Sequence, residues 1–210
     1  MHAYDETLLY KAQTTLARMF DYAVNDYGMP IKVFYELFLN SKFSRRFAAG
    51  DSRTIAGCSG TELAREIISD ATGESDFPKA KTVPDRTSEY WLGYNIAYYQ
   101  WKKGISFEAI TRSIGIDYIL SMYSKYHEMD ILQFIDHIDE LRQKNMDTMQ
   151  LKRLRSYARL SQSQLAKASG VPLRTIQQYE QGQKDISKAA FETVLALSKV
   201  LKCDPEKLIG

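Results

Sequence analysis

Residues 160–182 read LSQSQLAKASGVPLRTIQQYEQG, and this stretch decides the fold of the C-terminal part of the chain. Ser161 precedes an apolar-periodic run, as an N-cap does, and Gly170 supplies a residue that tolerates a positive φ angle. Pro172 suits the first turn of a further helix, which Gly182 then ends. The pattern therefore predicts two short helices joined by a tight three-residue turn.

The flanking residues extend this pattern to five short helices over 150–209. The first is expected at 152–159. Ser187 is expected to cap the fourth, with Phe191 on its inward face, and Asp204 to cap the last. A helix, a short turn and a helix is the arrangement that lets the second helix of the pair lie in the major groove of DNA.

Residues 148–210 resemble a known family. The matching short segments, in chain order, are Leu160-Ser161-Gln162, Gln164-Leu165-Ala166, Gly170-Val171, Thr175-Ile176, Tyr179-Glu180 and Gly182. In these positions the sequence strongly resembles the Cro and lambdoid-repressor helix-turn-helix family, also called the xenobiotic-response-element (XRE) family. The resemblance implies a five-helix domain that binds double-stranded operator DNA as a transcriptional regulator.

The resemblance also implies roles for individual side chains. It implies that Leu173, Arg174, Gln177 and Gln178 contact base edges of the DNA. It implies that Arg153, Gln162 and Lys184 contact phosphates. Arg155 and Glu180 match a pair that in the family joins the first and third helices. Gln can pair with the N6 and N7 edge of adenine and Arg with O6 and N7 of guanine, whereas a leucine can meet only a thymine methyl group. The alternative is that the glutamines form a solvated polar face.

The charge distribution agrees with a polyanion partner for the C-terminal part. Residues 1–147 hold 17 Lys+Arg and 21 Asp+Glu, a net charge of −4. Residues 148–210 hold 11 Lys+Arg and 5 Asp+Glu, a net charge of +6. A basic segment on an acidic body favours nucleic acid as the partner, although a solvated basic face would give the same count.

The remaining residues also read as helices. Apolar residues recur at spacings of three and four in the stretches 3–26, 30–38, 89–103 and 130–142, and Ser59 and Glu62 have the spacing of a capping box. The sequence predicts an all-α chain with a partner-binding or dimerisation domain at 1–142, a linker at 143–147 and the helix-turn-helix domain at 148–210. The polar stretch 70–88, which Gly73, Pro78 and Pro84 interrupt, is expected to be a long connection within the first domain.

Composition excludes several classes of protein. At 44% hydrophobic and 26% charged residues the chain is not disordered throughout, and no run is long and apolar enough to span a membrane. Two distant cysteines and no visible secretory signal favour a cytoplasmic location. His127, Asp130, Asp136 and His137 match no metal-binding spacing, so neither a metal nor another cofactor is expected.

The N-terminal region bears a weaker resemblance to antitoxin-type proteins encoded beside ADP-ribosyltransferase-like toxins. The segments that carry it are FYELFL at 34–39, IAGCSG at 55–60, YWLGY at 90–94 and YQW at 99–101. This resemblance implies a repressor that silences its own operon and whose N-terminal domain binds a protein toxin. The homodimer is implied by the helix-turn-helix resemblance, because that family usually reads two half-sites related by twofold symmetry.

A small-molecule sensor is the alternative, and Trp91, Tyr94 and Tyr98 are the candidate partner or ligand surface in either case. Together with Trp101 they form an aromatic stripe whose spacing is also that of a helix face buried in a core or in an interface. An enzyme is not expected, because no catalytic constellation is visible.

Overall fold

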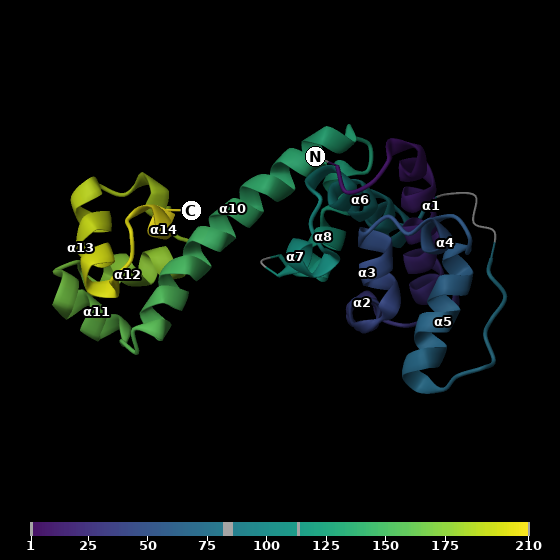
Figure 1. Ribbon diagram of the computed structural model, residues 1–210, viewed down its shortest axis with the longest axis horizontal. Coiled ribbons are helices and arrows are strands. Elements are labelled where there is room, and N and C mark those ends of the chain that lie inside the picture. Colours follow the sequence, from purple (N-terminus) through teal and green to yellow (C-terminus); the bar gives the residue numbers. More distant parts are fainter. Residues whose placement is uncertain (1, 82–85, 113, 210) are drawn as a thin grey trace. The chain divides into compact units, whose positions relative to one another are not determined.

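The computed structural model describes residues 2–81, 86–112 and 114–209. Every regular element among these residues is a helix, which confirms the expectation of an all-α fold (Figure 1). Packing divides the chain into two compact units, unit 1 ending at Ile135 and unit 2 beginning at Asp136. Among the described residues, no helix combines the length and the apolar character that crossing a bilayer requires.

Unit 1 consists of short and medium helices. They are η1 (Glu6–Leu8), α1 (Leu9–Asp21), the π-helical turn η2 (Tyr22–Asp26), α2 (Ile31–Asn40), α3 (Lys42–Ala48), α4 (Ser52–Ile55), α5 (Gly60–Thr72), α6 (Ser88–Lys103), α7 (Phe107–Thr111), α8 (Ile116–Ser121) and α9 (Tyr123–Tyr126).

Local sequence signals set where these helices begin. The Asp5 carboxylate accepts a hydrogen bond of 2.8 Å from the backbone N–H of Thr7 at the start of η1. The capping box at α5 is confirmed, because the N–H of Glu62 donates to Ser59 Oγ at 3.2 Å and the N–H of Ser59 donates to the Glu62 carboxylate at 2.7 Å. Two of the N–H groups left unpaired at a helix start are thereby satisfied.

Helix α6 is central to unit 1, with buried residues along it from Trp91 to Trp101. It packs along α1, and both helices have buried faces. Gly93 permits this close approach, since a Cβ on it would lie 2.6 Å from the carbonyl oxygen of Leu16 and 2.7 Å from Cα of Ala17. The remaining core is strongly aromatic. Its members include Phe20, Phe34, Phe38, Phe47, Phe107 and Phe134.

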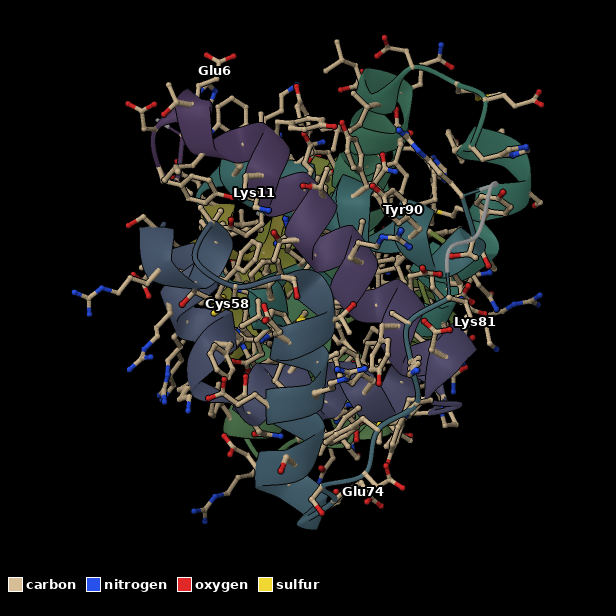
Figure 2. The ribbon with its side chains drawn as sticks, turned by 90° about the vertical axis from the view of Figure 1, so that its right-hand side faces the viewer. Glu6, Lys11, Cys58, Glu74, Lys81 and Tyr90 are labelled. Atoms are coloured by element: carbon tan, nitrogen blue, oxygen red, sulfur yellow. The ribbon has the colours of Figure 1, made fainter. Side chains whose placement is uncertain are left out.

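The connection between α5 and α6 begins at Gly73, since α5 continues through Asp70 to Thr72. Figure 2 shows its described part running as an extended chain from Glu74 to Lys81. The carbonyl oxygen of Pro78 accepts hydrogen bonds of 2.7 Å from the hydroxyl of Tyr22 and of 2.7 Å from the guanidinium of Arg65. This part of the connection is therefore attached to the body of unit 1. Pro84, which the sequence also marks as a helix breaker, lies outside the described residues.

Helix α10 (Ile131–Tyr157) contains residues 143–147, which the sequence predicts as the linker. The run QKNMD at 143–147 contains neither Gly nor Pro, so nothing in it ends a helix. The division between the two units falls earlier, between Ile135 and Asp136.

Unit 2 continues after α10 with α11 (Gln162–Ser169), α12 (Leu173–Glu180), the 3₁₀ turn η3 (Ile186–Lys188), α13 (Phe191–Leu201) and α14 (Glu206–Ile209). These elements surround one apolar core. Its buried residues are Leu151, Leu165, Val171, Ile176, Tyr179, Ile186, Val194, Leu197, Leu201 and Leu208.

Two sequence predictions about α13 are wrong. Ser187 does not cap it but lies inside η3, where its N–H donates to the Asp185 carboxylate at 2.9 Å. Phe191 does not face the core but is 69% exposed as the first residue of α13. The reason is that η3 places Ile186 in this end of the core, so the helix itself begins later in the chain.

Candidate nucleic-acid interface

Helices α11 and α12 pack against each other and are joined by three residues. Gly170 ends α11 with φ +74°, the left-handed conformation that the sequence predicts for this glycine. Val171 then enters the core, and Pro172 immediately precedes α12. A turn this short fixes the direction of α12 with respect to α11, which is the requirement for a helix that docks in a groove.

Helix α12 has one buried and one outward face. Ile176 and Tyr179 anchor it in the core of unit 2. The four side chains that the sequence predicts as base-reading lie on the other side: Leu173 and Arg174 are exposed, and Gln177 and Gln178 are half-buried. Neither glutamine amide forms a side-chain hydrogen bond with any described residue, so both keep donors and acceptors for an external partner.

Arg155 and Glu180 form a buried ion pair between α10 and α12. Two of its bonds join the guanidinium to the two carboxylate oxygens, at 2.6 Å from Nε and 2.9 Å from Nη2, and the third, of 2.7 Å, runs from Nη1 to the carbonyl oxygen of Leu160. The side chains are 13% and 3% exposed. Burial opposes ionisation of Glu180, but the hydrogen bonds from Arg155 and Gln162 outweigh it and hold the pKa of Glu180 below its usual value. The hydrogen bond to Glu180 raises the pKa of Arg155.

Gln162 belongs to this network, which the sequence does not reveal. Its Nε2 donates to the second oxygen of Glu180 at 2.7 Å. The resemblance assigns Gln162 to a phosphate, and the bond to Glu180 uses one of the two N–H donors of its amide, which leaves the other for a phosphate oxygen. The backbone N–H groups at the start of α11, where the helix dipole also favours an anion, are further donors for the same phosphate.

The two predicted phosphate-contacting cations differ in their surroundings. Arg153 donates to the side-chain oxygen of Gln150 at 2.6 Å on α10. Lys184 is exposed and lies beside the recognition helix, because its backbone N–H donates to the carbonyl oxygen of Gln178 at 3.2 Å. Within the ranges that the structure describes, neither cation forms an ion pair with a carboxylate, so both charges are free to meet phosphate.

Residues 151–208 match a protein-family model described as helix-turn-helix. The C-terminal unit contains an XRE-type helix-turn-helix domain. A domain of this kind indicates a DNA-binding transcriptional regulator. The comparisons with curated proteins and with solved structures find no match for the chain.

The candidate partner surface in unit 1 is different from the one the sequence predicts. Trp91 is only 9% exposed and packs edge-on against Tyr123 and Phe134, so its ring belongs to the core. Tyr98 is half-buried against Trp101. Of the three predicted residues, Tyr94 is the one that reaches an exposed group of aromatic and basic side chains.

That group, the tyrosine–arginine patch, consists of Tyr10, Arg18, Arg86, Tyr90 and Tyr94. The Arg86 guanidinium lies 5.5 Å from the ring centre of Tyr90 and 5.7 Å from that of Tyr94, and Arg18 lies 5.8 Å from that of Tyr90, which is labelled in Figure 2. Tyr10 is 70% exposed. Tyr and Arg are the residue types that carry most binding energy in protein interfaces. The spacing of Tyr10 and Arg18 on one polar face of α1 is the signal that could have found the patch.

Metal binding gains no support from the geometry. Among the described residues no group of three or more His, Cys, Asp or Glu side chains is placed to hold an ion. His127 instead has a ring nitrogen 2.8 Å from the carbonyl oxygen of Tyr123 and stacks on the ring of Tyr123.

Proposed function

We propose that the protein is a sequence-specific transcriptional repressor that binds a duplex operator as a homodimer. The observation that carries this proposal is the outward face of α12, with Arg174, Gln177 and Gln178 available beside the cation of Lys184. Major-groove edges of adenine and guanine are the partners that these side chains suit. The role is one of binding rather than catalysis.

Unit 1 is proposed to bind a protein toxin, which would make the protein an antitoxin that represses its own operon. The tyrosine–arginine patch supports this role, because arginines stacked on tyrosine rings are held in place before binding and lose less side-chain entropy. Burial raises the pKa of Tyr94, so its hydroxyl stays protonated and can donate to a carbonyl or carboxylate group of the partner.

A ligand-sensing repressor is the second candidate, and one cavity favours it. This cavity of about 520 Å³ in unit 1 is lined by residues that include Arg45, Ser44, Phe107 and Gln100. Gln100 is 1% exposed, and its side-chain oxygen has no hydrogen-bond partner among the described residues. Co-purification separates the two candidates: a stoichiometric protein supports the antitoxin, and a bound small molecule supports the sensor.

The base-reading role of α12 is tested by replacing Gln178 with alanine. On a duplex that the full chain selects from a random pool, Gln178→Ala is expected to weaken binding by about 1–3 kcal/mol, because a bidentate contact to one base is lost. Binding to unrelated duplexes should not change. Equal losses on both kinds of DNA would remove Gln178 from the base-reading set.

Lys184→Ala provides the contrast, because the predicted contact of Lys184 is to phosphate. It should weaken both kinds of binding alike and reduce the slope of log K against log salt by about 0.9.

A further inference from the structure

A surface cavity in unit 1 lies between α3, α4 and α5 and gathers basic side chains. Its volume is about 470 Å³, and its lining includes Lys42, Arg46 and Arg53. Cys58, which is labelled in Figure 2, is half-buried in its wall. The cavity shares no lining residue with the one at Gln100 and none with the tyrosine–arginine patch. It is therefore a feature that the proposed function does not use.

Two of its three cations keep their donors free. Lys42 donates to the Glu66 carboxylate at 2.7 Å. Arg46 and Arg53 are exposed, and within the described part of the chain neither guanidinium forms a hydrogen bond or an ion pair. A guanidinium stays charged and offers five N–H donors in a planar fork, so both arginines can bind an external anion.

Asp51 shows that these two arginines lie close to the same point. Its carboxylate accepts hydrogen bonds of 2.7 Å from the hydroxyl of Thr54 and of 3.2 Å from the backbone N–H of Arg53. The bond from Thr54 lowers the pKa of Asp51 most, and the positive charges of Arg46 and Arg53 lower it further. Both guanidinium groups thus act on one carboxylate without pairing with it.

The cavity is basic although the body around it is acidic. Its lining holds three cations and the two carboxylates of Asp51 and Glu66, a net charge of +1, whereas residues 1–147 carry −4. The bond to Glu66 raises the pKa of Lys42, and the charge of Arg46 opposes that rise, so these two cations repel each other. An anion bound among the cations would relieve this repulsion.

We propose that this cavity binds a phosphate monoester, which Arg46 and Arg53 hold through its oxygens. A phosphate monoester has a charge of about −1.5 to −2 at pH 7 and three acceptor oxygens, so it can engage two guanidinium forks. A carboxylate has one charge and two oxygens, which one fork satisfies. A nucleic acid is a polyanion, and the net charge of −4 on residues 1–147 repels it.

The test is calorimetric titration of the full chain with phenyl phosphate and, separately, with benzoate as a carboxylate of similar size. Phenyl phosphate should bind saturably, with a dissociation constant at least about tenfold below that of benzoate, because it brings a further oxygen and more charge. Its affinity should fall between about pH 7.5 and about pH 5, since the second pKa of a phosphate monoester is about 6.

Two variants assign the binding to the arginines. Arg46→Gln and Arg53→Gln should each raise the dissociation constant of phenyl phosphate by at least about tenfold, because each removes hydrogen bonds to a charged group. Both side chains are exposed, so circular dichroism should show an unchanged fold. Arg112→Gln is the matched control, because Arg112 is an exposed arginine of the same unit that pairs with Glu108 at 3.3 Å, and it should leave the constant unchanged.

Titration with O-phosphoserine, free and within a hexapeptide that is otherwise uncharged, separates two sources of the phosphate group. Tighter binding of the free amino acid supports a phosphorylated metabolite, and tighter binding of the peptide supports a phosphorylated protein segment. The inference is overturned if phenyl phosphate shows no saturable binding, if benzoate binds equally well, or if both arginine variants keep the wild-type affinity.

This site goes beyond the proposed function and is judged separately from it. None of these titrations contains DNA, so a chain that binds phenyl phosphate and no duplex would leave this inference standing and refute the operator proposal. A chain that binds its operator but not phenyl phosphate would do the reverse.

Discussion

Arg155→Met is expected to destabilise unit 2 by about 3–5 kcal/mol, because it leaves the Glu180 carboxylate buried without its cation. Glu180 is 3% exposed and, among the described residues, would keep only the amide of Gln162 as a side-chain hydrogen-bond partner. Both tryptophans, Trp91 and Trp101, lie in unit 1. The loss should therefore appear in the unfolding transition followed by helical circular dichroism and by hydrogen exchange in unit 2, while tryptophan emission stays unchanged.

Two further variants decide whether charge burial is the cause. Arg155→Met combined with Glu180→Leu removes both charges and should recover most of the stability, as replacement of a buried pair by apolar residues does in general. Lys188→Met breaks an exposed pair of 3.6 Å with Asp185 and should cost no more than about 1 kcal/mol. If Arg155→Met costs no more than Lys188→Met, the buried pair does not hold α10 and α12 together.

The same pair gives the wild type a dependence on pH. Because the folded-state pKa of Glu180 is lowered, its contribution is complete above the unfolded value of about 4.3 and is lost as the pH falls through the lower folded value. The stability of unit 2 should therefore fall more steeply on acidification in the wild type than in the double variant.

Gly93→Ala is expected to destabilise unit 1 by more than about 3 kcal/mol, since overpacking against backbone cannot be relieved by a side-chain rotation. The new methyl group would lie 2.6 Å from the carbonyl oxygen of Leu16 and 2.8 Å from the nitrogen of Ala17. Thermal unfolding followed by tryptophan emission measures the effect, because Trp91 and Trp101 are both on α6 with Gly93.

Gly115→Ala is the control, because a Cβ at Gly115 meets no atom within 4 Å. Its effect should stay within about 1 kcal/mol, the usual size for a substitution away from packed contacts. Equal effects of the two substitutions would show that α1 and α6 do not need the close approach.

Much of unit 2 can be predicted from sequence because its signals are local. Ser161 caps α11 as expected, and Gly170 takes the left-handed conformation expected of it. Periodicity alone did not reveal that η3 delays the start of α13 and turns Phe191 outward, because that depends on which residue fills the end of the core.

Contacts between distant elements were harder to predict. The amide of Gln162 reaches Glu180 across eighteen positions of sequence, and no local pattern indicates that bond. In unit 1 an aromatic stripe on α6 is compatible with core and with surface, and only packing against Tyr123 and Phe134 assigns Trp91 to the core. The exposed patch therefore centres on Tyr10, Tyr90 and Tyr94 rather than on the stripe as a whole.

Selection from a random duplex pool by the full chain measures whether the helix-turn-helix domain reads duplex DNA. We expect enrichment of a defined sequence whose log K falls linearly with log salt, with a slope of about 0.9 for each phosphate contact. If no sequence is enriched and no duplex is bound even at about 50 mM salt, where phosphate contacts are strongest, the domain does not read DNA.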